Sequence, residues 1–105
     1  MAKGYILSPE AQGDIQAIRA YYLDEAGAKV ARYVLREIGA GFRMLASSPG
    51  VGHIRDDLTD EPVKFWPVFS YLIVYDPATR PIGIARVLHA SRDLVKMFYR
   101  LPPRM

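Results

Sequence analysis

The sequence predicts a single α+β domain, in which an N-terminal helical hairpin packs on a small, mostly antiparallel sheet. Apolar residues recur with helical period through the first half of the chain, and runs rich in aromatic and β-branched residues follow over residues 63–89. Because helices and strands do not alternate, a parallel βαβ sheet is disfavoured. The expected order is β-α-α-β-β-β-α over residues 1–105, a length that supports one hydrophobic core.

The first strand and helix are predicted from a clear start signal. Residues 4–7 favour a short strand. Ser8 can cap free amides, Pro9 fits the first helical position, and Glu10 complements the positive end of the helix dipole. Gly27 is expected to end the helix in the left-handed conformation. The apolar stripe between these ends comprises Ala11, Ile15, Ile18 and Tyr22.

A second amphipathic helix follows directly and ends before Pro49. Gly39 and Gly41 lie inside it, where each costs about 1 kcal/mol relative to alanine. They indicate either a close crossing with another backbone or tolerated weak positions. Neither helix can bury its stripe alone, so the hairpin needs a sheet. The second stripe comprises Ala31, Val34, Leu35, Ile38, Phe42 and Leu45.

Three strands and a closing helix complete the expected fold. A polar connection over residues 51–62 leads to the strands, and a turn at residues 76–81 separates the last two. Asp93–Leu101 predicts a short closing helix, which Pro102 stops. The expected strands are residues 63–69, 71–75 and 82–89.

The middle of these strands is apolar on both faces. Tyr71, Ile73 and Tyr75 point to one face, and Leu72 and Val74 point to the other. The helical hairpin can cover only one face, so the closing helix, a second chain or both must cover the other. An apolar free face suggests a partner site; the alternative is that the closing helix suffices.

Composition and charge restrict the class of protein. The absence of cysteine excludes disulfides and thiolate metal sites, and with no signal peptide or span-length apolar run it predicts a cytoplasmic protein. Residues 1–62 carry 7 Lys/Arg and 9 Asp/Glu, whereas residues 63–105 carry 7 and 2. This asymmetry suggests a nucleic acid or an acidic protein segment as partner, unless the surplus only aids solubility.

Four blocks carry a resemblance to a known family: Tyr5–Ala11 with Asp14-Ile15, Pro49-x-x-Gly52-x-x-Arg55-x-Asp57-Leu58, Ser70–Tyr75 and Arg86–Asp93. In these blocks the sequence resembles the ParE-type toxins of type II toxin–antitoxin systems, within the RelE/ParE superfamily. The resemblance implies a RelE/ParE-like fold, DNA gyrase as the target, and a cognate antitoxin. The antitoxin's C-terminal segment would wrap the toxin in a hetero-oligomeric complex.

RelE-like members of the superfamily instead cut messenger RNA on the ribosome, so a ribosome-dependent endoribonuclease is the alternative. Such cleavage needs a base, an acid and cations that converge. Arg86 and His89 are three residues apart and point to opposite faces of a regular strand, although a bulge could change this. His89 is therefore interpreted as structural and His53 as a solvated loop residue. The candidate groups are His53, Lys64, Tyr75, Arg86, His89, Arg92 and Tyr99.

Comparison with the RelE-like pattern favours a non-catalytic toxin. Leu72 stands where that pattern has a phosphate-clamping arginine, and Lys64 is alone where it has several lysines. Its C-terminal tyrosine falls at Phe98, which cannot transfer a proton, although Tyr99 lies beside it. Arg92 matches a family arginine. No catalytic residue, metal site or cofactor is expected.

The residues expected to bind antitoxin or gyrase are basic and aromatic, because such residues usually anchor buried interfaces. For Trp66 a place in the core is the alternative, and Pro67 suggests an edge strand or a bulge. A plain nucleic-acid-binding module that uses the basic C-terminal part is a third hypothesis. The expected contact residues are Lys64, Trp66, Arg86, Arg92, Lys96, Phe98, Tyr99 and Arg100.

Overall fold

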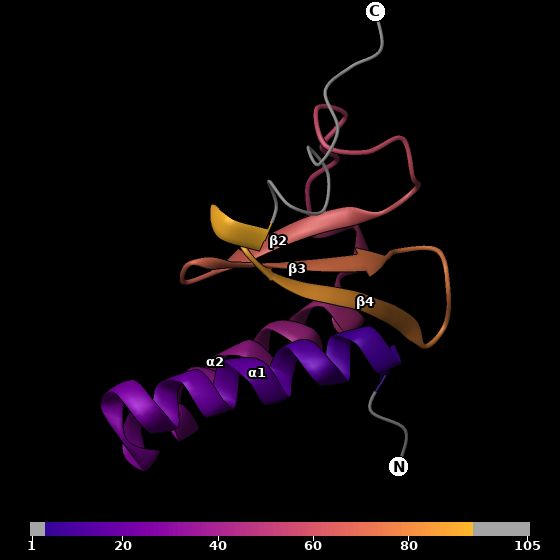
Figure 1. Cartoon of the computed structure of the whole chain (residues 1–105). Coiled ribbons are helices and arrows are strands. Elements are labelled where there is room, and N and C mark those ends of the chain that lie inside the picture. Colours follow the sequence, from indigo (N-terminus) through magenta and orange to yellow (C-terminus); the bar gives the residue numbers. More distant parts are fainter. Residues whose placement is uncertain (1–3, 94–105) are drawn as a thin grey trace, which may run out of the picture.

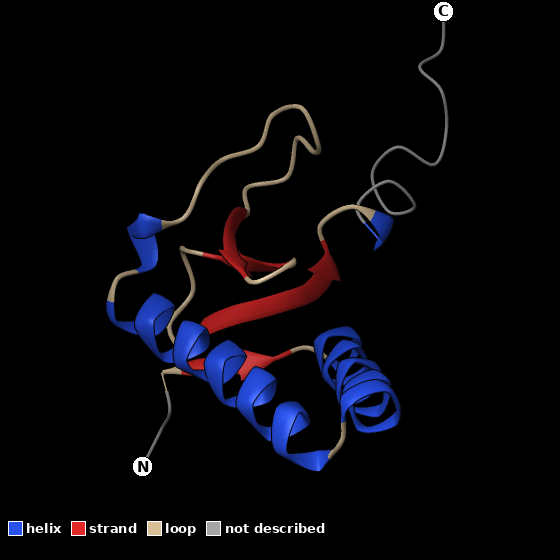
Figure 2. Cartoon of the chain, turned by 90° about the vertical axis from the view of Figure 1, so that its left-hand side faces the viewer, coloured by secondary structure: helices blue, strands red, loops and turns tan. Residues whose placement is uncertain are grey.

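Two helices, α1 (Pro9–Ala26) and α2 (Ala28–Ser47), lie side by side against one face of a sheet (Figure 1). Figure 2 shows the same two layers from the side. This computed structural model describes residues 4–93. The strands are β1 (Tyr5–Leu7), β2 (Lys64–Val68), β3 (Tyr71–Asp76) and β4 (Ile82–His89), and a 3₁₀ turn, η1 (Pro49–Val51), follows α2. The predicted α+β class is confirmed.

The four strands form one mixed sheet in the order β1-β4-β3-β2. β1 runs parallel to β4, and the other two pairings are antiparallel. The prediction of a mostly antiparallel sheet is therefore confirmed. Of the predicted closing helix, Asp93–Leu101, only Asp93 is described; it is helical, as is Arg92 before it. Residues 94–101 of that helix, with Lys96, Phe98, Tyr99 and Arg100, lie outside the described residues.

The start of α1 follows the predicted capping pattern. The Ser8 hydroxyl accepts a hydrogen bond from the Ala11 amide at 2.9 Å and donates one to the Ala85 carbonyl at 2.7 Å. The cap thus also ties the helix to β4. Gly27 ends α1 with the expected positive φ of 91°, although its ψ of 171° is extended and differs from that of a left-handed helical residue.

The two glycines inside α2 have different surroundings. A Cβ at Gly41 would lie 3.0 Å from Ile73 Cδ1 and 3.2 Å from Val68 Cγ2, so the helix comes close to side chains of the sheet there. A Cβ at Gly39 would meet only the guanidinium of Arg43, at 3.5 Å. Gly41 therefore marks a close approach, while Gly39 is a tolerated weak position.

The faces of β3 alternate as predicted. Tyr71, Ile73 and Tyr75 belong to the main core beneath the helices, whereas Leu72 and Val74 belong to a second apolar cluster. The connection between η1 and β2 runs over this second face (Figure 1), and its Leu58 is buried there. The sequence prediction named the closing helix or another chain as the cover of this face and did not include this loop; residues 94–101 of the closing helix lie outside the described residues.

Among the described residues, no helix is both long and apolar enough to cross a membrane.

Candidate partner-binding site

Asp14 on α1 closes the edge of β4. β1 pairs with residues 82–84 of β4, and beyond them the Asp14 carboxylate takes the place of a neighbouring strand. It accepts hydrogen bonds from Arg86 Nε at 2.8 Å, Arg86 Nη2 at 2.9 Å and the Val87 amide at 2.9 Å. The hydrogen bond with Asp14 raises the pKa of Arg86 above its ordinary value. Arg86, expected as a partner contact, thus already has an internal partner.

A β-bulge precedes Arg86 in β4. Val74 is opposite Arg86 and Tyr75 is opposite Ile84, so Ala85 is an extra residue in β4. The bulge lies before Arg86 and not between Arg86 and His89. Arg86 reaches Asp14, while the His89 ring packs edge-on against Tyr71, with ring centres 5.5 Å apart.

His89 and Asp93 close the turn that follows β4. The His89 amide donates to Asp93 Oδ2 at 2.9 Å, and His89 Nδ1 accepts from the Arg92 amide at 3.2 Å. With Nδ1 as acceptor, neutral His89 carries its proton on Nε2. Burial favours a higher pKa for Asp93, but the His89 hydrogen bond and Arg92 outweigh it and lower the pKa. These contacts support a structural role for His89.

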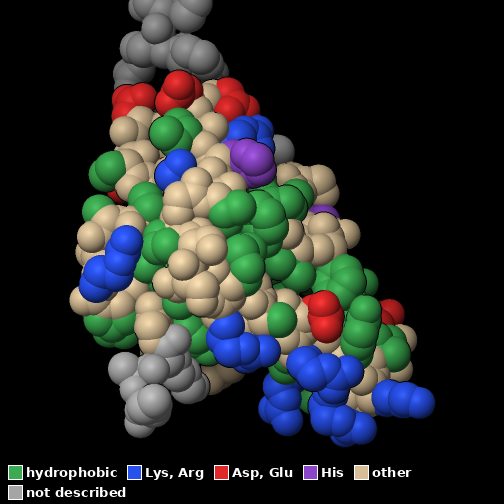
Figure 3. Space-filling model, turned by 180° about the vertical axis from the view of Figure 1, so that it is seen from behind, with side chains coloured by type: hydrophobic (Ala, Val, Ile, Leu, Met, Phe, Trp, Pro, Cys, Tyr) green, Lys and Arg blue, Asp and Glu red, His purple; other side chains and the backbone are tan. Residues whose placement is uncertain are grey.

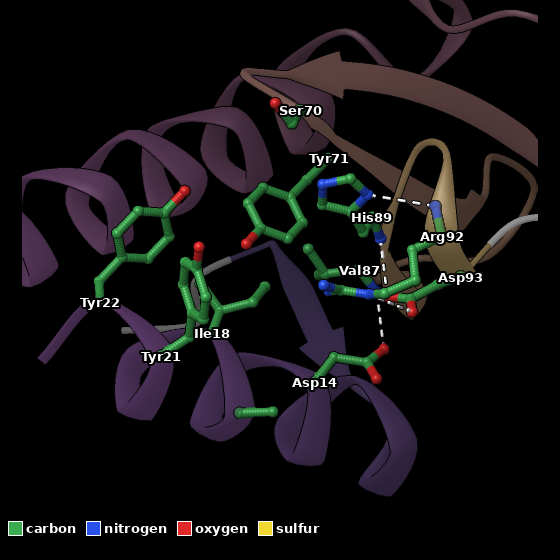
Figure 4. Close-up of a pocket in the computed structure, with 11 residues that line it drawn as sticks. Asp14, Ile18, Tyr21, Tyr22, Ser70, Tyr71, Val87, His89, Arg92 and Asp93 are labelled. Atoms are coloured by element: carbon green, nitrogen blue, oxygen red, sulfur yellow. Dashed lines mark hydrogen bonds and ion pairs between the residues drawn. The ribbon is translucent and has the colours of Figure 1, made fainter. Parts of the chain in front are cut away.

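A pocket of about 280 Å³ opens between α1 and the ends of β3 and β4 (Figure 4). In it Tyr71 lies between Tyr22 on one side and His89 on the other. Burial and a side-chain hydrogen bond with Tyr22 raise the pKa of Tyr71 to about 12. At neutral pH the Tyr71 phenol therefore stays protonated, and Arg92 adds a cation to the pocket. The remaining lining residues are Asp14, Ala17, Ile18, Tyr21, Ser70, Val87 and Asp93.

This pocket combines aromatic surface, hydrogen-bond donors and a half-exposed cation. Arg92 contacts Asp93 through Nε, at 3.3 Å, and its side chain remains 62% exposed. The guanidinium can therefore still contact an acidic group of a partner. Aromatic residues and arginine are the usual anchors of protein interfaces. The pocket is therefore suited to receive a side chain or carboxylate of another protein.

Lys64 and Trp66 form a second patch on β2, at the opposite edge of the sheet. His53 pairs with Phe65 there through two backbone hydrogen bonds of 2.8 Å. Its ring stacks on Trp66, with centres 6.1 Å apart and planes 9° from parallel. His53 is exposed, as interpreted from the sequence, but its backbone pairing with Phe65 and its ring contact with Trp66 were not predicted. Lys64 Nζ donates to the Gly52 carbonyl at 3.4 Å.

The described members of the expected contact set therefore fall into two groups. Arg86 and Arg92 lie near α1 at the end of β4, and Lys64 and Trp66 lie on β2, with β3 between the two strands. The edge-strand prediction from Pro67 is confirmed. Trp66 is half-buried against the main core, so its ring contributes to packing as well as to the surface.

Two further residues bear on RNA cleavage. The Tyr75 hydroxyl donates to the Pro49 carbonyl at 2.7 Å and accepts from the Gly52 amide at 2.9 Å, and the residue is fully buried. Burial raises the pKa of Tyr75, although the Gly52 hydrogen bond opposes this. Leu72, at the position of the RelE-like arginine, is 8% exposed within the second apolar cluster. Both side chains serve the fold.

The sequence did not single out the tyrosines of the pocket or Asp14 as site residues. Tyr22 was assigned to the apolar stripe, and Tyr21 beside it drew no attention. A usable signal was present in Asp14 and Arg86, which are opposite charges within two of the resemblance blocks. For the described residues, no group of three His, Cys, Asp or Glu side chains is placed to hold a metal ion.

Comparison with known proteins supplies the family context. The family model described as the ParE toxin of the type II toxin–antitoxin system parDE matches residues 5–94. Among solved structures, a chain of the chromosomal ParDE TA system from P. aeruginosa aligns with a TM-score of 0.70 and 18% identity, over 83% of this chain and 95% of that one. At that identity the likeness supports the fold. No curated protein matches the sequence.

Proposed function

Because this chain belongs to the ParE toxin family of type II toxin–antitoxin systems, we propose that it inhibits DNA gyrase by binding and that a cognate antitoxin neutralises it. Inhibition by binding needs no proton transfer and no metal ion. It needs an interface with a few well-placed anchors. The pocket between α1 and β4 offers such anchors in Arg92 and the exposed Tyr21.

The observation that carries a non-catalytic role is the engagement of the candidate nuclease groups in internal contacts. Tyr75 is held by the backbone of residues 49–52, and His89 uses Nδ1 to close its own turn. Arg86 is paired with Asp14. A general base must reach the proton that it removes, and a phosphate clamp must be free to meet phosphate. With these contacts in place, Tyr75, His89 and Arg86 would have to leave their internal partners before they could remove a proton or bind a phosphate.

We propose that Arg92 and the pocket tyrosines contact one partner and that Lys64 and Trp66 contact the same or a second one. Because one patch lies at the ends of β3 and β4 and the other on the edge strand β2, an extended segment of antitoxin is the simplest way to engage both. Lys96, Phe98, Tyr99 and Arg100 remain proposed contacts outside the described residues.

Gyrase inhibition is tested with purified toxin, gyrase, ATP and plasmid. The expected result is loss of supercoiling together with linear DNA that appears after denaturation and protease treatment. Arg92→Gln should weaken the effect by about tenfold or more, the size expected for an interface arginine. Arg80→Gln is the matched control, because Arg80 only contacts turn carbonyls of Pro77 and Thr79. Unchanged gyrase activity at high toxin concentration would refute the proposal.

The nuclease alternative is tested in the same preparation with translating ribosomes and mapped messenger ends. Codon-specific cuts that disappear in Arg92→Gln would establish the RelE-like activity instead. Neutralisation is tested with the product of the short reading frame beside the gene. That protein should restore supercoiling and raise the melting temperature, since a ligand at 100 times its Kd stabilises the folded state by about 2.7 kcal/mol.

A further inference from the structure

A row of basic side chains follows the outer face of α2. Lys29, Arg32, Arg36 and Arg43 are all exposed and are spaced by three, four and seven residues. That spacing places them on one side of a helix, opposite the buried stripe that includes Val34, Ile38 and Leu45. Lys29 and Arg43 are fourteen positions apart, which corresponds to about 21 Å of helix. We call these four residues the basic stripe.

Opposing charge does not neutralise the basic stripe. Within residues 4–93 the ion pairs are those of Arg55, Arg86 and Arg92, and none involves a member of the stripe. Glu37 is the single acid of α2. Lys and Arg side chains gather at the tip of the helical hairpin, at lower right in Figure 3, while a group of acidic side chains lies at the other end of the molecule.

The arrangement does not serve the stability of the helix. Arg32 and Arg36 are four residues apart, and like charges at this spacing destabilise a helix by roughly 0.2–0.5 kcal/mol. An exposed helix that retains several unpaired cations on one face is better explained by an anionic partner than by folding. No acidic residue of α2 belongs to the same face as the four cations.

A shallow depression and two aromatic side chains lie beside the basic stripe. An open depression of about 440 Å³ is lined by Lys29, Val30, Arg32, Tyr33 and Arg36. The Arg36 guanidinium lies 5.7 Å from the centre of the Tyr33 ring, and the exposed Phe69 packs on the same tyrosine at 5.8 Å. These contacts hold Arg36 near the hollow. Three cations around one depression can receive a phosphate group.

We propose that the basic stripe binds the phosphate backbone of duplex DNA without sequence specificity. A straight row of about 21 Å spans roughly six phosphates of one strand at 3.4 Å each. Single-stranded nucleic acids favour aromatic platforms with open ring faces, whereas the Tyr33 ring already contacts Arg36 and Phe69. The inference does not depend on the target of the toxin.

The test measures binding of the full chain to a 20-base-pair mixed-sequence duplex by fluorescence anisotropy over a range of salt concentrations. Four phosphate contacts predict a slope of log K against log salt of about −3.6. The double variant Arg32→Gln/Arg36→Gln should flatten the slope by about 1.8 and lower the affinity by about tenfold per lost contact at 50 mM salt. Arg55→Gln/Arg80→Gln removes the same charge from loops elsewhere and is the matched control.

Because the four side chains are exposed, the stripe variant should be folded and at least as stable as the parent, which circular dichroism and urea unfolding check. Loss of DNA binding in the stripe variant, with binding retained in the control, supports the proposal. Equal binding by parent and stripe variant overturns it. Tighter binding to single-stranded DNA or RNA of the same length, or competition by poly-glutamate as strong as by duplex DNA, assigns the stripe to another partner and also overturns it.

Discussion

At the scale of single residues, the Asp14 carboxylate accepts three hydrogen bonds from β4. One carboxylate holds the Arg86 guanidinium through two bonds and also receives the Val87 amide. The pair is partly shielded from water, with side-chain exposures of 28% for Arg86 and 15% for Asp14. Charge-assisted, bidentate bonds of this kind are stronger than surface ion pairs. Asp14 therefore fixes α1 to β4 at the point where β1 ends.

A double-mutant cycle measures this link. Asp14→Asn and Arg86→Gln should each lower the free energy of unfolding by about 2 kcal/mol, because each leaves a partly buried charge without its partner. The double variant should lose clearly less than the sum of the two. Urea unfolding at neutral pH gives all three values. Additive losses would show that the two side chains are not coupled.

Tyr71 makes stability depend on alkaline pH. Its pKa is raised from 10.0 to about 12 in the folded protein, so the folded state keeps the phenol proton that the unfolded chain loses. The stabilisation is therefore complete below pH 10 and is lost as the pH rises from 10 to about 12. Compared with Tyr71→Phe, the parent should lose about 1 kcal/mol more between pH 8 and pH 11.

Urea unfolding at the two pH values provides the measurement for Tyr71. Tyr33→Phe, at an exposed ring outside the pocket, is the matched control and should follow the parent. A parent protein whose loss equals that of Tyr71→Phe would show that the phenol is not held protonated in the pocket.

At the scale of elements, α2 contains two glycines with opposite surroundings. Alanine at Gly39 meets only an ordinary contact with Arg43, so Gly39→Ala should stabilise the protein by up to about 1 kcal/mol through helix propensity. Alanine at Gly41 crowds Ile73 and Val68, and crowding of this kind costs about 1–3 kcal/mol. Chemical unfolding should place the two variants at least about 1 kcal/mol apart, and equal stabilities would contradict the close approach at Gly41.

Elements with local signals were predictable from the sequence, and their long-range contacts were not. The Ser8 cap and the two apolar stripes depend on residues within a turn of each other, and the structure confirms them. The partner of Arg86 is 72 positions away, and no local pattern selects it. The bulge at Ala85 and the stacking of His53 on Trp66 likewise arise only when distant strands pair.

At the scale of the whole molecule, the net charge of a segment does not show where its charged side chains lie in space. The first 62 residues have a small acidic surplus, which drew attention to the C-terminal part. Four of those acids lie in the connection after η1, whereas the basic stripe lies on α2. Figure 3 shows a group of acidic side chains at one end of the molecule and most of the visible Lys and Arg side chains toward the other. Reading charge by helical face, as was done for the apolar residues, would have found the stripe.

The cover of the second sheet face also affects the stability of the protein and its tendency to associate. The second face is buried in part by Leu58, at 8% exposure, from a loop that carries little other apolar side-chain burial. Leu58→Ala should cost about 2–4 kcal/mol and open the cluster formed with Phe65, Leu72 and Leu88. An apolar sheet face opened in this way favours association between chains.

Unfolding measurements and light scattering over a range of protein concentrations test both effects of Leu58→Ala. Ile54→Ala is the matched control, because Ile54 belongs to the same loop but is 65% exposed, and its change should stay within about 0.5 kcal/mol. If Leu58→Ala remains as stable and as monomeric as Ile54→Ala, the loop does not hold the second face. The apolar residues of β3 would then need a partner chain for their cover, as the sequence pattern first suggested.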